Sequence, residues 1–174
     1  MRTIINLVGL QVGWWACAWG AATERPWFGV LVVTVHIIFH LWGAPDKKRD
    51  IRLILALSLI GAVVDGLFKT GGVLIYAAPW PDIPLVGPIW IVAMWALFAT
   101  AITTSLAWIK GRLLLAGVLG AIFGPLSYWT GVGVGGVAWG WSPLAATILL
   151  ATVWGGVMVG LAWWLAYDAA SIDK

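Results

Sequence analysis

Charged residues are scarce in this sequence of 174 residues. Asp, Glu, Lys and Arg together make up 10% of it, whereas a soluble domain carries roughly 25%. Hydrophobic residues make up 62% of the chain, and a water-soluble fold of this length could not hide so much apolar surface from water. The composition therefore excludes an ordinary soluble domain and predicts a membrane protein.

Cysteine and histidine are also rare, which excludes several kinds of site. Cys17 is the only cysteine, so no internal disulfide can form, and we expect it to be a small packing residue. Di-iron membrane oxygenases need many histidines, and this chain has only His36 and His40. Their spacing puts both on one face of a helix, where they could bind one metal ion with a carboxylate such as Asp65 but could not hold both faces of one haem. We therefore expect no metal and no other cofactor, and these two histidines are the residues that would hold one.

Six apolar stretches qualify as membrane spans, because crossing the hydrocarbon core takes about 20 residues. They account for most of the chain and their connections are short, so residues 1–174 are expected to form one all-α domain, a bundle of six transmembrane helices. Pro125 and the glycine-rich run 131–136 predict an irregular outer end of the fifth span. The predicted spans are about 4–22, 27–43, 53–78, 87–109, 113–137 and 143–168.

Outside the spans, the basic residues lie almost entirely on one side of this predicted bundle. They occupy both termini and two of the connections, while only Arg25, beside Glu24, lies on the other side. The positive-inside rule then places both termini and both basic connections in the cytoplasm. The net charge of +3 reflects this topology, so we expect membrane lipids and not nucleic acid as partners. The residues concerned are Arg2, Lys47, Lys48, Arg49, Arg52, Lys110, Arg112 and Lys174.

Two charged residues, Asp65 and Lys69, interrupt the apolar third span. A charge near the middle of a bilayer costs about 2.5–3.5 kcal/mol, so such residues usually face protein or water and often mark a functional site. The two residues lie one helical turn apart, and we expect them to form an ion pair near the middle of the span. This pair could bind a charged headgroup, relay a proton through water to His36, or only join the third span to the bundle.

Tryptophans and hydrogen-bonding residues form a further candidate site. Trp95 and three other tryptophans lie too deep for an aromatic belt, so their rings either pack in the bundle or line a cavity for an apolar or acyl ligand. Ser127 and Tyr128 are placed to form hydrogen bonds between helices. Four glycine pairs with GxxxG spacing allow close contacts within the chain, with a second copy or with another membrane protein. The other three tryptophans are Trp14, Trp15 and Trp154.

The motif GPLSYxxG at residues 124–131 stands in the fifth span, and Asp65 in the third. Together with the residues named at the end of this paragraph, they resemble an uncharacterised bacterial family of small polytopic inner-membrane proteins over nearly the whole chain. The resemblance implies an inner-membrane location. Genes of that family often lie near relatives of cyclopropane-fatty-acid synthase, which implies lipid chemistry or lipid handling. Lys69 and His40 are not part of the pattern. The remaining residues that carry it are Asn6, Gln11, Trp15, Trp90, Trp95, Phe98, Ser105 and Trp108.

These observations leave three hypotheses. A lipid-handling enzyme or accessory protein would hold an acyl chain among the deep tryptophans while Asp65, Lys69 and His36 engage its polar end. A proton-coupled transporter or channel would use the same charges as a relay, but the second half has no counterpart to Asp65, which favours lipid handling. A structural subunit of a larger membrane complex would need neither a lipid site among the tryptophans nor a proton relay through the charges. The candidate site residues are Asp65, Lys69, His36, Ser127, Tyr128 and Trp95.

Overall fold

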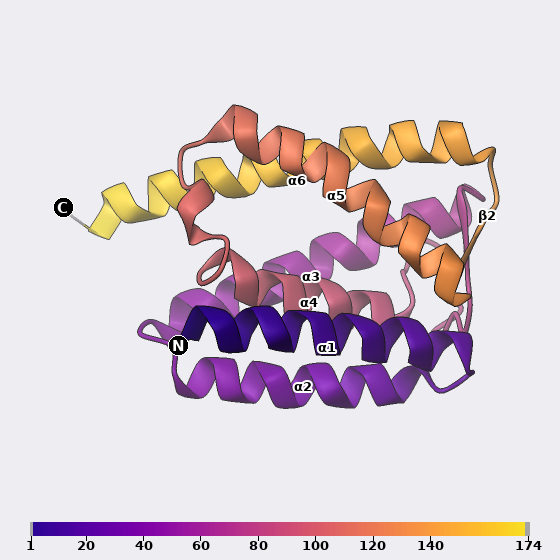
Figure 1. The fold of residues 1–174 in the computed structure, drawn as a ribbon, viewed down its shortest axis with the longest axis horizontal. Coiled ribbons are helices and arrows are strands. Elements are labelled where there is room, and N and C mark those ends of the chain that lie inside the picture. Colours follow the sequence, from indigo (N-terminus) through magenta and orange to yellow (C-terminus); the bar gives the residue numbers. More distant parts are fainter. Residues whose placement is uncertain (1, 173–174) are drawn as a thin grey trace.

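Residues 2–172, which the computed structural model describes, form six α-helices and a short two-stranded ribbon (Figure 1). The helices lie roughly along one direction, with α5 and α6 on one side, α1 and α2 on the other, and α3 and α4 between and behind them in this view (Figure 1). The all-α class is confirmed. The elements are α1 (Arg2–Ala22), α2 (Pro26–Trp42), α3 (Lys47–Thr70), β1 (Leu74–Tyr76), α4 (Ile89–Ile102), α5 (Leu113–Val134), β2 (Val137–Trp139) and α6 (Pro143–Ile172).

Four of these helices, α1, α3, α5 and α6, are long and apolar enough to cross a membrane. α2 has 17 residues and α4 has 14, so both are apolar but shorter than a typical span. Large apolar side chains cover much of the outside, including Phe39 (67% exposed), Leu59 (68%) and Leu114 (83%). Water would not tolerate so continuous an apolar surface, whereas lipid does. The fold is therefore that of a helical membrane protein.

The helix α3 does not match the predicted third span of residues 53–78. It begins at Lys47, because the Asp46 side chain accepts a backbone N–H hydrogen bond of 2.9 Å and caps the first turn. It ends at Thr70, where the chain turns through Gly72 with a left-handed φ of 66°. The predicted span thus ran past the end of the helix, and the apolar residues beyond it belong to β1 and the following loop.

The strands β1 and β2 pair antiparallel, with Tyr76 opposite Val137, at the end of the bundle away from the start of α1 (Figure 1). This end is called the ribbon end below. α5 stops at Val134 because Gly135 turns the chain with a left-handed φ of 89°. α5 is helical through Pro125 and into the glycine-rich run, so the irregularity predicted there is limited to the helix stopping three residues before the predicted end of the fifth span. The strands were not predicted, because β1 lies inside the predicted third span and β2 begins at the last residue of the predicted fifth span.

The helix α4 is shorter than the predicted fourth span of residues 87–109. After α4 ends, the chain turns and forms a short 3-10 helix, η1 (Ala107–Ile109). It then approaches α6, where the backbone amide of Gly111 donates a hydrogen bond of 3.0 Å to the Ala162 carbonyl. This connection lies at the opposite end from the ribbon, as do the start of α1 and the connection from α2 to α3 (Figure 1).

Basic residues gather at this second end, which is called the basic end below. Two buried or half-buried pairs of polar side chains join its helices. His40 Nε2 lies 2.8 Å from Asp50 Oδ2 and links α2 to α3, and Arg49 Nε lies 2.7 Å from Asp168 Oδ2 and links α3 to α6. Cys17 lies in the core, where a Cβ on Gly29 would collide with it. Its burial supports the packing role predicted for it.

Candidate functional site

The carboxylate of Asp65 is the centre of the candidate site. Its side chain is fully buried (0% exposed). Oδ1 accepts hydrogen bonds from the hydroxyls of Tyr76 and Tyr128, both at 2.7 Å, and Oδ2 accepts one of 2.8 Å from Trp95 Nε1. These four residues, called the carboxylate cluster below, come from β1, α3, α4 and α5. The cluster therefore ties the ribbon and three helices together.

The predicted ion pair between Asp65 and Lys69 does not form. Lys69 Nζ instead lies 3.2 Å from Asp82 Oδ1 and donates a hydrogen bond of 3.0 Å to the Ile83 carbonyl. Its place in the last turn of α3 lets the long side chain reach the loop at the ribbon end and avoid the apolar interior. Among the described residues, neutral donors surround Asp65 and no cationic side chain pairs with it.

The depth predicted for Asp65 is also wrong. It lies five residues before Thr70, the last residue of α3, and bonds to Tyr76 of the ribbon. Asp65 is therefore near the ribbon end and not near the middle of the helix. The error follows from the predicted span of residues 53–78, whose outer part is strand and loop in the structure.

Trp95 and Trp154 form the aromatic floor beside the carboxylate cluster. Their rings stack with centroids 4.6 Å apart and an interplanar angle of 16°. Two glycines make room for them, since a Cβ on Gly61 would collide with the Trp95 ring and a Cβ on Gly124 with the Trp154 ring. The first glycine of the GPLSYxxG motif thus allows α6 to place a tryptophan against α5. This floor explains why small residues are needed at both positions.

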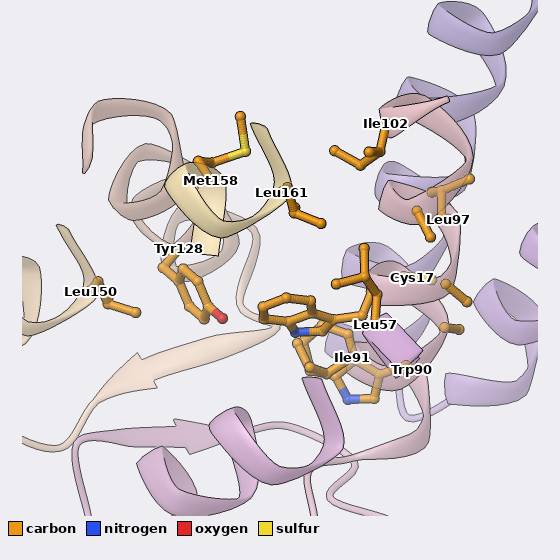
Figure 2. Packing of buried hydrophobic residues seen from close by; sticks show 14 of the residues in the cluster. Cys17, Leu57, Trp90, Ile91, Leu97, Ile102, Tyr128, Leu150, Met158 and Leu161 are labelled. Atoms are coloured by element: carbon orange, nitrogen blue, oxygen red, sulfur yellow. The ribbon is translucent and has the colours of Figure 1, made fainter. Parts of the chain in front are cut away.

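A cavity of about 640 Å³ lies between α1, α4, α5 and α6, and the stacked rings of Trp95 and Trp154 form part of its wall. Most of its wall is aromatic or aliphatic, and among the described residues none that lines it is charged. Trp95 and Tyr128 belong to the wall, whereas Asp65 does not. Figure 2 shows the Tyr128 hydroxyl pointing from α5 toward the layer that holds Trp90 and Ile91. The carboxylate therefore lies behind the wall and holds two of its side chains in place. This volume, called the aromatic cavity below, is within the range of about 300–1,000 Å³ that is usual for ligand pockets.

Ser127, the other polar residue of the motif, lines the aromatic cavity but bonds within its own helix. Its Oγ donates a hydrogen bond of 2.7 Å to the Gly124 carbonyl. Gln11 and Thr130 also line the cavity and are exposed. The cavity thus offers a few neutral polar groups in a wall that is otherwise apolar. This chemistry suits the uncharged hydrocarbon part of a ligand.

The two histidines lie in other polar clusters and not beside Asp65. His36 Nε2 is 3.2 Å from Thr100 Oγ1, which also accepts a hydrogen bond of 2.9 Å from the Asn6 amide. His40 is paired with Asp50. Among residues 2–172, no three His, Cys, Asp or Glu side chains gather as a metal site would require. The relay predicted from His36 through water to Asp65 and Lys69 is thus divided among three separate groups.

Sequence reasoning missed Tyr76 as a site residue. It was placed inside a helix, although the preceding pair of glycines and the short run that follows are the signals of a turn and a strand. The sequence predicts only that Trp154 lies deep in the membrane. Its contact with Trp95 depends on how α6 packs against α4, which no local pattern reveals.

Comparisons with curated proteins and with solved structures found no match. A family described as a protein of unknown function, DUF2878, matches residues 3–160, which include the whole carboxylate cluster and every residue that lines the aromatic cavity. An uncharacterised family is what the resemblance predicted. On this match the chain belongs to the DUF2878 family of proteins of unknown function.

Proposed function

We propose that this chain is a multi-pass protein of the bacterial inner membrane that binds the apolar part of a lipid in the aromatic cavity. The observation that carries the proposal is the cavity itself, which has a volume of about 640 Å³ and a wall of aromatic and aliphatic side chains. A void of this size between membrane helices is costly to leave empty, because its wall loses the packing contacts that a filled interior provides. Hydrocarbon is the material that the surrounding membrane supplies.

The position of the cavity also supports entry from the membrane. Several of its lining residues are exposed on the outside of the bundle, among them Trp15 (51% exposed), Phe123 (62%) and Leu126 (50%). The cavity therefore opens between these side chains on the apolar surface. A lipid could enter sideways without leaving the hydrocarbon region.

The proposed topology follows from the charges. In this topology all six helices cross the membrane. The basic end faces the cytoplasm, as do both termini, in agreement with the positive-inside rule. The ribbon end, with Asp65 behind the cavity wall, faces the opposite side.

In this proposal Asp65 is a positioning residue. It holds the Trp95 ring and the Tyr128 hydroxyl through hydrogen bonds of 2.8 and 2.7 Å. Both side chains have their polar atoms turned away from the cavity, so the ligand meets their apolar parts. The separation of Asp65, Lys69 and His36 into three groups gives no support to the hypothesis of a proton-coupled transporter. A structural subunit would leave the cavity without a defined ligand, and the experiment below distinguishes that case.

The test measures lipid that stays bound to the purified protein. Leu119 lines the cavity, whereas Leu114, on the same helix, is 83% exposed. Leu119→Trp fills the cavity, and Leu114→Trp makes the same change on the outer surface. We expect mass spectrometry of the wild type and Leu114→Trp to find about one tightly held lipid per chain, and Leu119→Trp to lose most of it. Bound lipid that matches the bulk membrane in composition and is the same in all three proteins would refute the proposal.

A further inference from the structure

One cation lies directly at the wall of the aromatic cavity. Trp108 lines the cavity and is 49% exposed, and the guanidinium carbon of Arg112 lies 6.0 Å from the centroid of its ring. Lys110 follows Trp108 closely in the same connection and is also exposed. None of the described residues that line the cavity is charged, so Arg112 supplies the charge in contact with its wall.

In the part of the chain that the structure describes, the acidic residues of the basic end are engaged elsewhere. Asp50 pairs with His40 at 2.8 Å, Asp168 lies 2.7 Å from Arg49, and Asp46 caps α3. Among the described residues no carboxylate pairs with Arg112 or Lys110. An arginine that stacks on a tryptophan keeps its donors free at the edges of the guanidinium plane. This part of the surface is therefore suited to an anion from outside the chain.

The shape of the cavity places that anion at one end of a long apolar space. In Figure 1, α5 is distant from α1 at the basic end and approaches it at the ribbon end, where β2 follows. The lining residues extend from Trp108 at the basic end to Val137 of the ribbon. Along α5 they run from Leu119 to Gly131, about 18 Å at 1.5 Å per residue. That length is close to half of a hydrocarbon core of about 30 Å, which is the depth of the acyl chains of one leaflet.

We infer that the ligand is an anionic phospholipid, with an acyl chain in the aromatic cavity and its phosphate on Arg112. Guanidinium groups bind phosphate oxygens with paired hydrogen bonds, and Lys110 adds a second positive charge nearby. The lipid then lies in the cytoplasmic leaflet, on the side of the basic end. This inference rests on the proposed function, because it needs the cavity to hold lipid, and it adds the headgroup and the residue that selects it.

The experiment compares two lipids with the same acyl chains. Delipidated protein in a mild detergent is titrated with dioleoyl phosphatidylglycerol or with dioleoyl phosphatidylcholine, and native mass spectrometry gives the affinity for each. We expect the wild type to prefer phosphatidylglycerol, and Arg112→Gln to weaken its binding about tenfold. Phosphatidylcholine should lose less, because its choline cation already neutralises the phosphate that both lipids carry. Arg112→Lys keeps the charge and should retain most of the preference. Arg52→Gln is the matched control, since Arg52 is also exposed at the basic end, whereas Arg112 lies over Trp108 of the cavity wall.

The outcomes separate the two proposals. Equal affinity for both lipids, or an equal loss in Arg112→Gln and Arg52→Gln, overturns the headgroup assignment. If Leu119→Trp still abolishes binding of both lipids in that case, the cavity holds lipid and only the headgroup inference has failed. If neither lipid binds saturably, or Leu119→Trp has no effect, the proposed function fails as well.

Discussion

The two tyrosine hydroxyls that donate hydrogen bonds to Asp65 allow a quantitative test of the carboxylate cluster. The chain has three tyrosines, of which Tyr76 and Tyr128 donate to Asp65 and Tyr167 is 64% exposed. Replacement by Phe removes only the hydroxyl, so Tyr76→Phe and Tyr128→Phe each delete one hydrogen bond to a buried carboxylate. Loss of a hydrogen-bond partner by a buried polar group costs about 1–3 kcal/mol. Tyr167→Phe removes a hydroxyl from the surface and should change stability by less than about 0.5 kcal/mol.

These losses are measurable as thermal stability in detergent. A loss of 1 kcal/mol lowers the melting temperature by roughly 2–4 °C for a chain of this size. Each variant of the cluster should therefore melt about 2–12 °C below the wild type, with Tyr167→Phe as the matched control. The double variant Tyr76→Phe with Tyr128→Phe should lose more than the sum, because Oδ1 of Asp65 then has no donor to offset its burial.

One result would refute this reasoning. If both single variants have the same melting temperature as Tyr167→Phe, the hydrogen bonds at Oδ1 do not stabilise the fold. Asp65 would then have to be stabilised by a partner other than the two tyrosines, and its role as the residue that positions the cavity wall would be lost.

Two further predictions concern residues beside the cluster. Lys69→Met should change stability by less than about 1 kcal/mol in a denaturant titration, because its partner Asp82 is exposed and such pairs contribute little; a loss as large as that of Tyr128→Phe would mean that Lys69 does neutralise Asp65. Gly124→Ala should cost about 1–3 kcal/mol, since its Cβ would collide with the Trp154 ring, whereas Gly133→Ala, on the same helix with open space around it, should cost much less. Equal stability of the two alanine variants would contradict the stacked floor.

The helical class and the grouping of charges follow from the sequence alone, because both depend on composition and on short segments. The 62% of hydrophobic residues and the clustered basic residues need no knowledge of contacts. The partners of Asp65 are different in kind. They lie 11, 30 and 63 positions away along the chain, so only the packed fold brings them to the carboxylate. A local pattern could offer Lys69 alone, which is why the ion pair was predicted.

The error at Lys69 has a second physical cause, the position of the helix end. A continuous apolar run from residue 53 to 78 resembles one long span, since hydropathy does not distinguish helix from buried strand. The pair of glycines that ends α3 is a weak signal in a membrane protein, where glycine is common in helices. Once the helix ends at Thr70, Lys69 lies within reach of water and Asp65 remains inside. The two charges then have different environments although they are one turn apart.

The two ends of the aromatic cavity therefore carry opposite kinds of polar group, and this difference bears on function. At the ribbon end a buried carboxylate is satisfied by Tyr76, Tyr128 and Trp95, so it has no hydrogen-bonding capacity directed at a ligand. At the basic end Arg112 lies over an exposed tryptophan of the cavity wall, with donors available. On the proposed function, such a site would hold a ligand with one polar end in only one orientation, with its hydrocarbon toward Asp65 and its headgroup toward Arg112. Asp65 then acts on the ligand only through the two side chains that it holds in the wall, and substitutions there should alter affinity for both lipids alike, while those at Arg112 alter the choice between them.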